Sequence, residues 1–248
     1  MNSFPINGIK SAHLKLNSLI FKTVCFAAYP KSDSEFVASM EDVLDTYAMP
    51  YNASIPVVCM DEQPAQLLNE KRPLIAETKE HPKRVDYEYE RAGTACLFMF
   101  VEPLSGWRKV EARPRRTKTD WAFEIEKLLR TKYANAEKVI LVCDNLNTHT
   151  RGAFYKEFPA EKAREIVKRI DFCYTPKHGS WLNIAENELS SMTRQCLRNR
   201  RIGDIDTLRK QTEAWAAKTN AKQRGVDWQF TVGDARHKLK SIYPKIKE

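Results

Sequence analysis

The sequence predicts an α/β fold in which a mixed β-sheet is flanked by helices. Short apolar runs typical of buried strands alternate with helix-like stripes through the second half of the chain. Two strand-like runs joined by Leu104-Ser105-Gly106 precede that alternation and predict an antiparallel unit. The chain has 248 residues, 42% of them hydrophobic, which is enough for a large core. An antiparallel opening followed by alternating strands and helices gives a mixed sheet between helices.

The first regular element is a helix expected over residues 33–48. Asp33 or Ser34 is a suitable N-terminal cap, and Pro50 follows the end. The apolar side chains recur at helical spacing, and the stripe consists of Phe36, Met40, Val43, Leu44 and Tyr47. Residues 1–32 lack clear periodicity, so we expect a poorly defined segment there and one domain over 33–248.

Strands are expected over residues 55–61, 94–103 and 107–114, each an apolar or alternating run. Between the first two, residues 63–93 hold three prolines and many charges. We expect this region to be a long excursion with only short pieces of structure.

The second half alternates between helices and strands. A helix over 117–133 is expected to turn Trp121, Ile125, Leu128 and Leu129 inward. The remaining elements are, in order, a strand over 138–145, a helix over about 152–169, a strand over 171–176, a helix over 183–198 striped by Ala185, Leu189, Met192 and Cys196, a helix striped by Ile205, Leu208, Thr212 and Trp215, and a short helix after Thr231. This order matches the ribonuclease H-like arrangement.

The charge balance indicates what kind of molecule the protein binds. The net charge is +9 and the isoelectric point about 9.2, with basic clusters at 115–118 and 198–201. Such a balance favours a polyanion, nucleic acid first, but a solvated basic surface explains it equally well. No apolar stretch is long enough to span a bilayer, so we expect a soluble cytoplasmic protein without a membrane partner. The six cysteines form no CxxC pair and are expected to be buried free thiols.

Three acids stand at places suited to chemistry. Asp61 and Asp144 each end a strand, and in α/β sheets ligands gather outside the carboxyl ends of strands. A single Asp at such a place also serves simply to cap the following turn. Glu186 lies about 100° round its helix from the apolar stripe, which would set it at the rim of the sheet. The alternative is a solvated acid favoured by the helix dipole, a role for which Glu188 is the nearby candidate.

Three separated carboxylates suit a pair of Mg²⁺ ions, which prefer hard oxygen ligands. Two ions about 3.5–4 Å apart can activate an attacking oxygen and stabilise a leaving one in phosphoryl transfer. Without a metal, clustered acids raise one another's pKa.

Four segments resemble one family: VVCMDEQPAQL, LVCDNLNTHT, YTPKHGSWLNIAENELS and the tail from RRIGDIDTLRK to SIYP. They are similar to the DDE catalytic domain of bacterial insertion-sequence transposases in the mariner-like superfamily, insertion-sequence family six-thirty. The match runs from about Asp33 to the C-terminus. Each motif is weak alone, and the combination is specific.

The resemblance implies a ribonuclease H-like fold and a triad of Asp61, Asp144 and Glu186 that holds two Mg²⁺, with Mn²⁺ as a substitute. Asn145, His149 and His178 match motif positions beside the triad. For His149, packing at a helix end is the alternative, and Trp181 suits a core anchor better than a base-stacking residue.

The implied partner is double-stranded DNA, both transposon ends and target, bound by a homo-oligomer at the bacterial nucleoid. Basic residues expected to hold phosphates without reading sequence are Arg115, Arg116, Lys177, Arg194, Arg198, Arg200 and Arg201.

The first thirty residues do not resemble the N-terminal helix-turn-helix region that such transposases carry, so we expect a shortened copy. Three functions follow. The first is a metal-dependent transposase that cleaves and joins DNA strands. The second is a non-catalytic remnant that binds DNA or transposase and inhibits transposition. The third is another ribonuclease H-like nuclease such as a resolvase, against which the HGSWLN loop and the tail argue.

Overall fold

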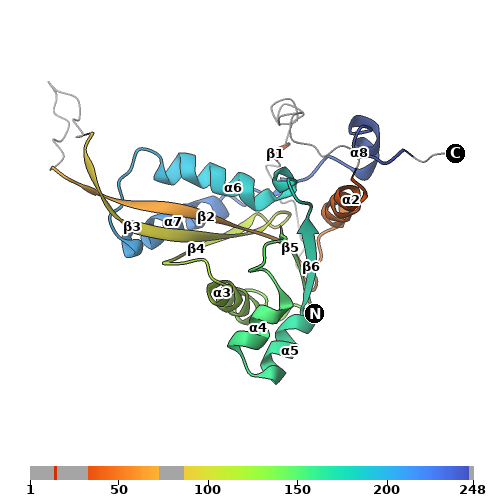
Figure 1. Cartoon of the computed structure of the whole chain (residues 1–248), viewed down its shortest axis with the longest axis horizontal. Helices are drawn as coiled ribbons and strands as arrows, with labels where there is room; N and C mark the ends of the chain where they lie inside the picture. The colour runs from red at the N-terminus through yellow and green to blue at the C-terminus, as the bar shows by residue number, and fades with distance from the viewer. Residues whose placement is uncertain (1–13, 16–32, 73–86, 246–248) are drawn as a thin grey trace, which may run out of the picture.

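A computed structural model describes residues 14–15, 33–72 and 87–245 (Figure 1). The segment expected to be poorly defined, 1–32, therefore lies outside the described residues except for Leu14–Lys15. That pair forms β1 (Leu14–Lys15), which runs parallel to β7 (Val226–Asp227) in a small two-stranded sheet.

The main sheet has five strands in the order β4-β3-β2-β5-β6. β2 (Val57–Glu70), β3 (Tyr89–Glu102) and β4 (Trp107–Arg113) are antiparallel neighbours. β5 (Val139–Asp144) and β6 (Ile170–Thr175) continue the sheet from β2 as parallel strands. The predicted mixed sheet is confirmed, with its antiparallel part first in the chain.

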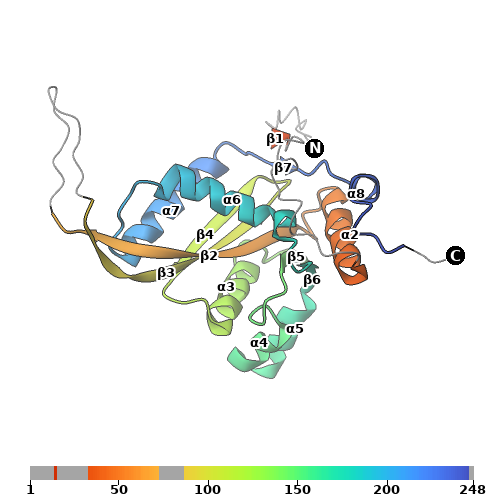
Figure 2. The same ribbon diagram turned by 45° about the horizontal axis from the view of Figure 1, so that its top comes forward.

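The prediction of an irregular excursion over 63–93 is wrong where the structure describes it. β2 continues to Glu70 and β3 begins at Tyr89, so the two strands form a long hairpin that projects from the body of the molecule (Figure 2). Pro64 is tolerated because β5 pairs with β2 only up to Cys59, and beyond that point one edge of β2 has no strand beside it. Gly93, at φ 114°, lies where the register shifts at Leu67/Leu68 and absorbs the bulge.

Helices cover both faces of the sheet. Figures 1 and 2 show α3 (Lys118–Arg130), α4 (Arg151–Glu157) and α5 (Ala160–Lys168) together on one side. On the other side lie α6 (Ile184–Met192) and α7 (Ile205–Asn220). The hydrophobic core on the α6 side also includes α2 (Ser34–Ala48) and α8 (Val232–Lys238).

Two helix predictions need correction. The helix expected over 152–169 is two helices, because Pro159 lies between α4 and α5 and lacks the N–H that a continuous helix needs. The helix expected over 183–198 ends as α6 at Met192 and continues as a π-helical turn, Thr193–Leu197. A 3₁₀ turn, Ser180–Leu182, precedes α6.

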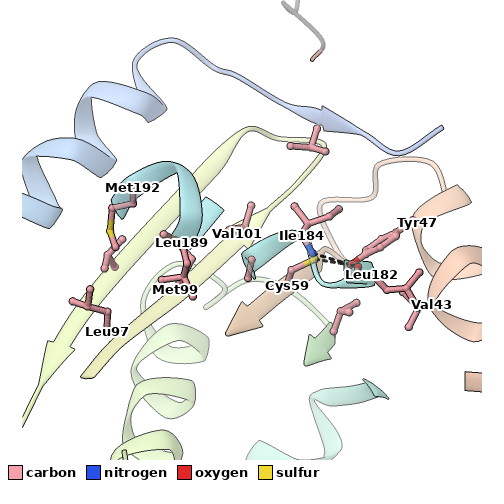
Figure 3. Close-up of a cluster of buried hydrophobic side chains, with 14 of the residues drawn as sticks. Val43, Tyr47, Cys59, Leu97, Met99, Val101, Leu182, Ile184, Leu189 and Met192 are labelled. Carbon is pink, nitrogen blue, oxygen red and sulfur yellow. Dashed lines mark hydrogen bonds between the residues drawn. The ribbon is translucent and has the colours of Figure 1, made fainter. Parts of the chain in front are cut away.

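Each face of the sheet carries its own hydrophobic core. In Figure 3, Leu189 and Met192 of α6 lie over Leu97 and Met99 of β3. The Tyr47 hydroxyl donates a hydrogen bond of 2.7 Å to the Leu182 carbonyl, which ties α2 to the entry of α6. The stripes predicted for the helices at 33–48, 117–133 and 183–198 are buried, as expected.

Five of the six cysteines are described, and all five are buried free thiols, as predicted: Cys59, Cys96, Cys143, Cys173 and Cys196. Cys25 lies outside the described residues. Within the ranges 33–72 and 87–245, no helix combines the length and the apolarity needed to cross a membrane.

Candidate active site

Asp61 and Asp144 lie on neighbouring parallel strands. Cys59 of β2 is paired with Val142 of β5, and each acid comes two residues later on its strand. β5 ends at Asp144, whereas β2 continues to Glu70, so Asp61 lies within β2 at the level where β5 ends and the two acids lie side by side.

Asn183 ties the helix turn of Glu186 to β2. Its side-chain oxygen accepts a hydrogen bond of 3.1 Å from the N–H of Ala185 and so caps α6. Its amide nitrogen donates a hydrogen bond of 2.9 Å to the carbonyl of Met60, the residue before Asp61. One buried side chain therefore starts the helix and fixes it to β2, and Glu186 falls in the first turn beside that link.

The charges of the other two acids act on Asp61. Burial raises the pKa of Asp61 to about 7, and the charges of Asp144 and Glu186 act in the same direction. The N–H of Glu62 opposes this effect by donating a hydrogen bond of 2.8 Å to Asp61 Oδ1. The structure thus places Asp61 beside Asp144 on the sheet and Glu186 in the helix turn that Asn183 ties to Met60.

His149 lies against Asp144 and is 1% exposed. Its Nδ1 is 2.7 Å from Asp144 Oδ1, and its Nε2 is 3.0 Å from Glu62 Oε1. Burial alone lowers the pKa of His149, but hydrogen bonds to Asp144, Cys143 and Glu62 outweigh it and raise the pKa well above the ordinary value. His149 is therefore both a packed residue and a direct neighbour of the acids.

Asn145 and His178 are placed differently. Asn145 follows Asp144 directly and is exposed. His178 is exposed in the turn after β6, with φ 65°. Among the described residues, neither makes a hydrogen bond to the three acids. Trp181 is partly buried against the core, as expected of an anchor.

Glu188 is not the solvated acid that the sequence suggested. It is 5% exposed, and Arg108 of β4 donates to both of its oxygens at 2.6 and 3.0 Å. Arg224 adds contacts of 2.9 Å to the same carboxylate. Arg108 is itself buried, so this charged cluster fixes α6 to β4 and to the turn after α7.

The acidic cluster has the chemistry of a divalent-metal site. Glu186 Oε2 is buried and has no hydrogen-bond partner among the described residues, and carboxylate oxygens are the hard ligands that Mg²⁺ and Mn²⁺ prefer. In the described part of the chain, no three His, Cys, Asp or Glu side chains converge closely enough to surround one ion. Asp144 has Oδ1 against His149, and its side chain is 38% exposed. The residue types fit the metal.

The predicted basic residues fall into two groups. Arg115 and Arg116 follow β4, and Lys177 follows β6; all three are exposed, and they follow the two edge strands that lie on either side of β2 and β5. The second group lies beyond α6 and consists of Arg194, Arg198, Arg200 and Arg201. Arg201 of this group is 15% exposed and forms an ion pair with Glu70. Next to it, the N–H of Leu68 donates a hydrogen bond of 2.9 Å to the Ile202 carbonyl, so this group lies beside the outer part of β2. Leu68 is seven residues beyond Asp61, roughly 23 Å along the strand, so the groups are separate.

Two residues of the site were missed in the sequence, Glu62 and Asn183. Glu62 follows Asp61 on a strand, where successive side chains point to opposite faces, so nothing local linked it to the same site. Asn183 was recognisable only as a suitable helix cap.

Comparisons with known proteins agree with this architecture. The crystal structure of the Mos1 mariner paired end complex with Mn superposes with a TM-score of 0.52 at 16% identity, covering 90% of this chain and 62% of that chain. The Mos1 paired-end complex with left transposon end gives 0.51 at 15%, covering 90% and 64%. At these identities the likeness shows the fold, which is ribonuclease H-like. The chain spans less than two thirds of the length of these Mos1 chains.

No curated protein matches the chain. A family model does: the model described as DDE superfamily endonuclease matches residues 56–209. That match covers well over half of the sequence and includes β2, β5 and α6 with their acids. The chain therefore belongs to the DDE superfamily of endonucleases.

Proposed function

We propose that this chain is the catalytic domain, over residues 33–248, of an insertion-sequence transposase of family six-thirty in the mariner-like superfamily. It cleaves DNA strands at the element's ends and joins them to target DNA. The observation that carries the proposal is that Asp61 and Asp144 lie side by side on a ribonuclease H-like sheet, with Glu186 in the helix turn that Asn183 ties to β2. Membership of the DDE superfamily of endonucleases supports the reaction class.

In this proposal Asp61, Asp144 and Glu186 hold two Mg²⁺ ions, for which Mn²⁺ substitutes. When bound, such ions activate the attacking oxygen and stabilise the leaving one. The chain's own contribution is placement. Asn183 holds Glu186 beside β2, and His149 holds Asp144 at the end of β5. A Mos1 paired end complex was solved with Mn, which agrees with this choice of metal.

The partner in this proposal is double-stranded DNA. Arg115, Arg116 and Lys177 hold the phosphates nearest the acids, and the second basic group holds phosphates farther along the duplex. The net charge of +9 supports a polyanionic partner. The Mos1 relatives are paired-end complexes, and we propose a homo-oligomer on DNA for this chain too, at the bacterial nucleoid.

Nicking of DNA tests this function. Labelled duplexes from both flanks of the chain's gene are incubated with the protein and Mg²⁺ or Mn²⁺. We expect metal-dependent nicks at the element's ends, lost in Asp144→Ala and in Glu186→Gln. Asp45→Ala on α2 and Glu165→Gln on α5 make the same changes at exposed positions and are expected to retain activity.

Absence of nicking in every protein, with equal salt-sensitive DNA binding, contradicts the proposal. It would favour the non-catalytic remnant, which binds DNA without cutting it.

A further inference from the structure

We propose that Glu62 and His149 act together as positioning residues that hold Asp144 in the orientation needed for metal binding. This inference rests on the proposed function, in which Asp144 is a metal ligand. It assigns to Glu62 a role in the site although its side chain leaves β2 on the opposite face from Asp61.

The Glu62–His149 pair reaches Asp144 from beneath the sheet edge. Val58 and Met60 belong to the core on the α3 side, and strand alternation places Glu62 on that face as well. The Glu62 side chain is 3% exposed and its Oε1 is 3.0 Å from His149 Nε2. The other ring nitrogen lies 2.7 Å from Asp144 Oδ1 and 3.2 Å from the Asp144 carbonyl oxygen. Both nitrogens of one rigid ring are thus engaged.

The imidazole ring has little room to turn. The Trp121 ring packs on it with centroids 5.3 Å apart at 31°, and Trp121 is itself completely buried. Tyr174 of β6 donates a hydrogen bond of 2.8 Å to the His149 carbonyl, which fixes the backbone as well. Asp144, by contrast, is 38% exposed at the end of its strand. The fixed ring therefore limits the rotation of the Asp144 side chain, whose Oδ1 lies against it.

Packing alone does not account for Glu62. A buried carboxylate loses its hydration, and an apolar side chain of similar volume often stabilises a protein as well or better. Glu62 Oε2 is also buried without a hydrogen-bond partner among the described residues, which adds to the cost. Partners that orient metal ligands typically change metal affinity 10–100-fold when mutated. A role of this kind explains why a charge is buried here.

Calorimetric titration with Mn²⁺ alone tests the proposal. Glu62→Gln keeps the size of the side chain and removes its charge, and we expect about 10-fold weaker Mn²⁺ binding. Glu165→Gln is the matched control and should bind as the wild type does. Thermal unfolding of each variant checks that the protein is folded. Glu62→Asp keeps the charge but shortens the reach, and we expect a similar loss, which provides a second variant if the Gln protein folds poorly.

A double-mutant cycle separates positioning from a general structural effect. In a His149→Gln background, Glu62→Gln is expected to cause no further loss of affinity, because the link through the ring is already broken. An equal loss in both backgrounds overturns the proposal, since Glu62 would then act without His149. Wild-type affinity in Glu62→Gln overturns it as well.

Asp144→Ala distinguishes the two claims. If this variant also binds Mn²⁺ like the wild type, the proposed function fails and the positioning role fails with it. If Asp144→Ala loses Mn²⁺ binding while Glu62→Gln keeps it, only the positioning role is wrong.

Discussion

Single residues show why part of the site is readable in the sequence and part is not. Asp144 was recognisable because it ends an apolar strand, and Asp61 because it follows an apolar run, although β2 continues past it to Glu70. Glu62 was not, because its contact with His149 spans 87 positions in sequence. The burial of Glu188 was unpredictable for the same reason, since its partner Arg108 lies on β4.

The Arg108–Glu188 pair is expected to be the most sensitive charged contact in the fold. Glu188→Gln leaves a buried guanidinium without its counter-charge, and breaking such a pair costs about 3–5 kcal/mol. Urea unfolding measures the loss, with the exposed Glu165→Gln expected to change the free energy of unfolding by less than about 0.5 kcal/mol. A similarly small change for Glu188→Gln would show that solvent reaches the pair.

Asn183 is expected to matter for stability and for activity together. Asn183→Ala removes the cap of α6, which costs about 1 kcal/mol, and also the hydrogen bond to Met60. Because that bond places Glu186, we expect nicking to fall more than the modest loss of stability explains. Asp204→Ala, which removes the side-chain cap of α7, is the matched control. Equal nicking by the two variants at a temperature where both are folded would contradict the placement role.

At the scale of elements, local pattern predicted helices better than the hairpin. The stripes of α2, α3 and α6 were readable because one buried face at helical spacing fixes the period. The extension of β2 and β3 was missed because most residues of their outer halves are at least partly exposed, so no continuous buried face marks them as strands. The break at Pro159 shows the reverse error, a single helix predicted across a residue that interrupts it.

The last helix, α8, provides a pH-dependent prediction. The hydrogen bond from Lys238, with those from Thr231, holds the pKa of Asp234 at about 2, below its usual 3.8. Because the folded value is the lower one, the ionised form stabilises the fold fully above pH 3.8, and this contribution is lost as the pH falls toward 2. Asp234→Asn should therefore melt at a lower temperature than the wild type at pH 6, and the gap should narrow below pH 3.8. A gap that stays constant between pH 6 and pH 3 would contradict the capping-box explanation.

At the scale of the whole molecule, a basic surface is combined with an acidic edge. The net charge of +9 attracts DNA, while Asp61, Asp144 and Glu186 repel phosphate unless cations stand between them. The charge was countable from the sequence. Its distribution over the surface was not, because the sheet order β4-β3-β2-β5-β6 puts Arg115, after β4, and Lys177, after β6, at opposite edges of the sheet.

Salt dependence measures the contribution of the first basic group. Replacing both Arg115 and Arg116 by Ala should lower the slope of log binding constant against log salt by about 2, since each phosphate contact contributes about 0.9. Fluorescence anisotropy with a labelled duplex provides the measurement. The pair Lys156→Ala and Lys168→Ala, on α4 and α5, is the matched control. An equal change of slope in both double variants would show that the whole surface, rather than this group, binds DNA.

The central claim is that the three acids touch the metal that performs the cleavage, and a change of ligand chemistry tests it most directly. Asp144→Cys replaces a hard oxygen ligand with a soft thiolate, which favours Mn²⁺ over Mg²⁺. The measurement is the ratio of nicking rates in Mn²⁺ and in Mg²⁺, compared with the wild type and with Asp45→Cys. We predict that Asp144→Cys loses nicking in Mg²⁺ and regains it in Mn²⁺, while Asp45→Cys keeps the wild-type ratio. Full activity of Asp144→Cys in Mg²⁺ would contradict the account, because the acid would then not be a ligand of the catalytic metal.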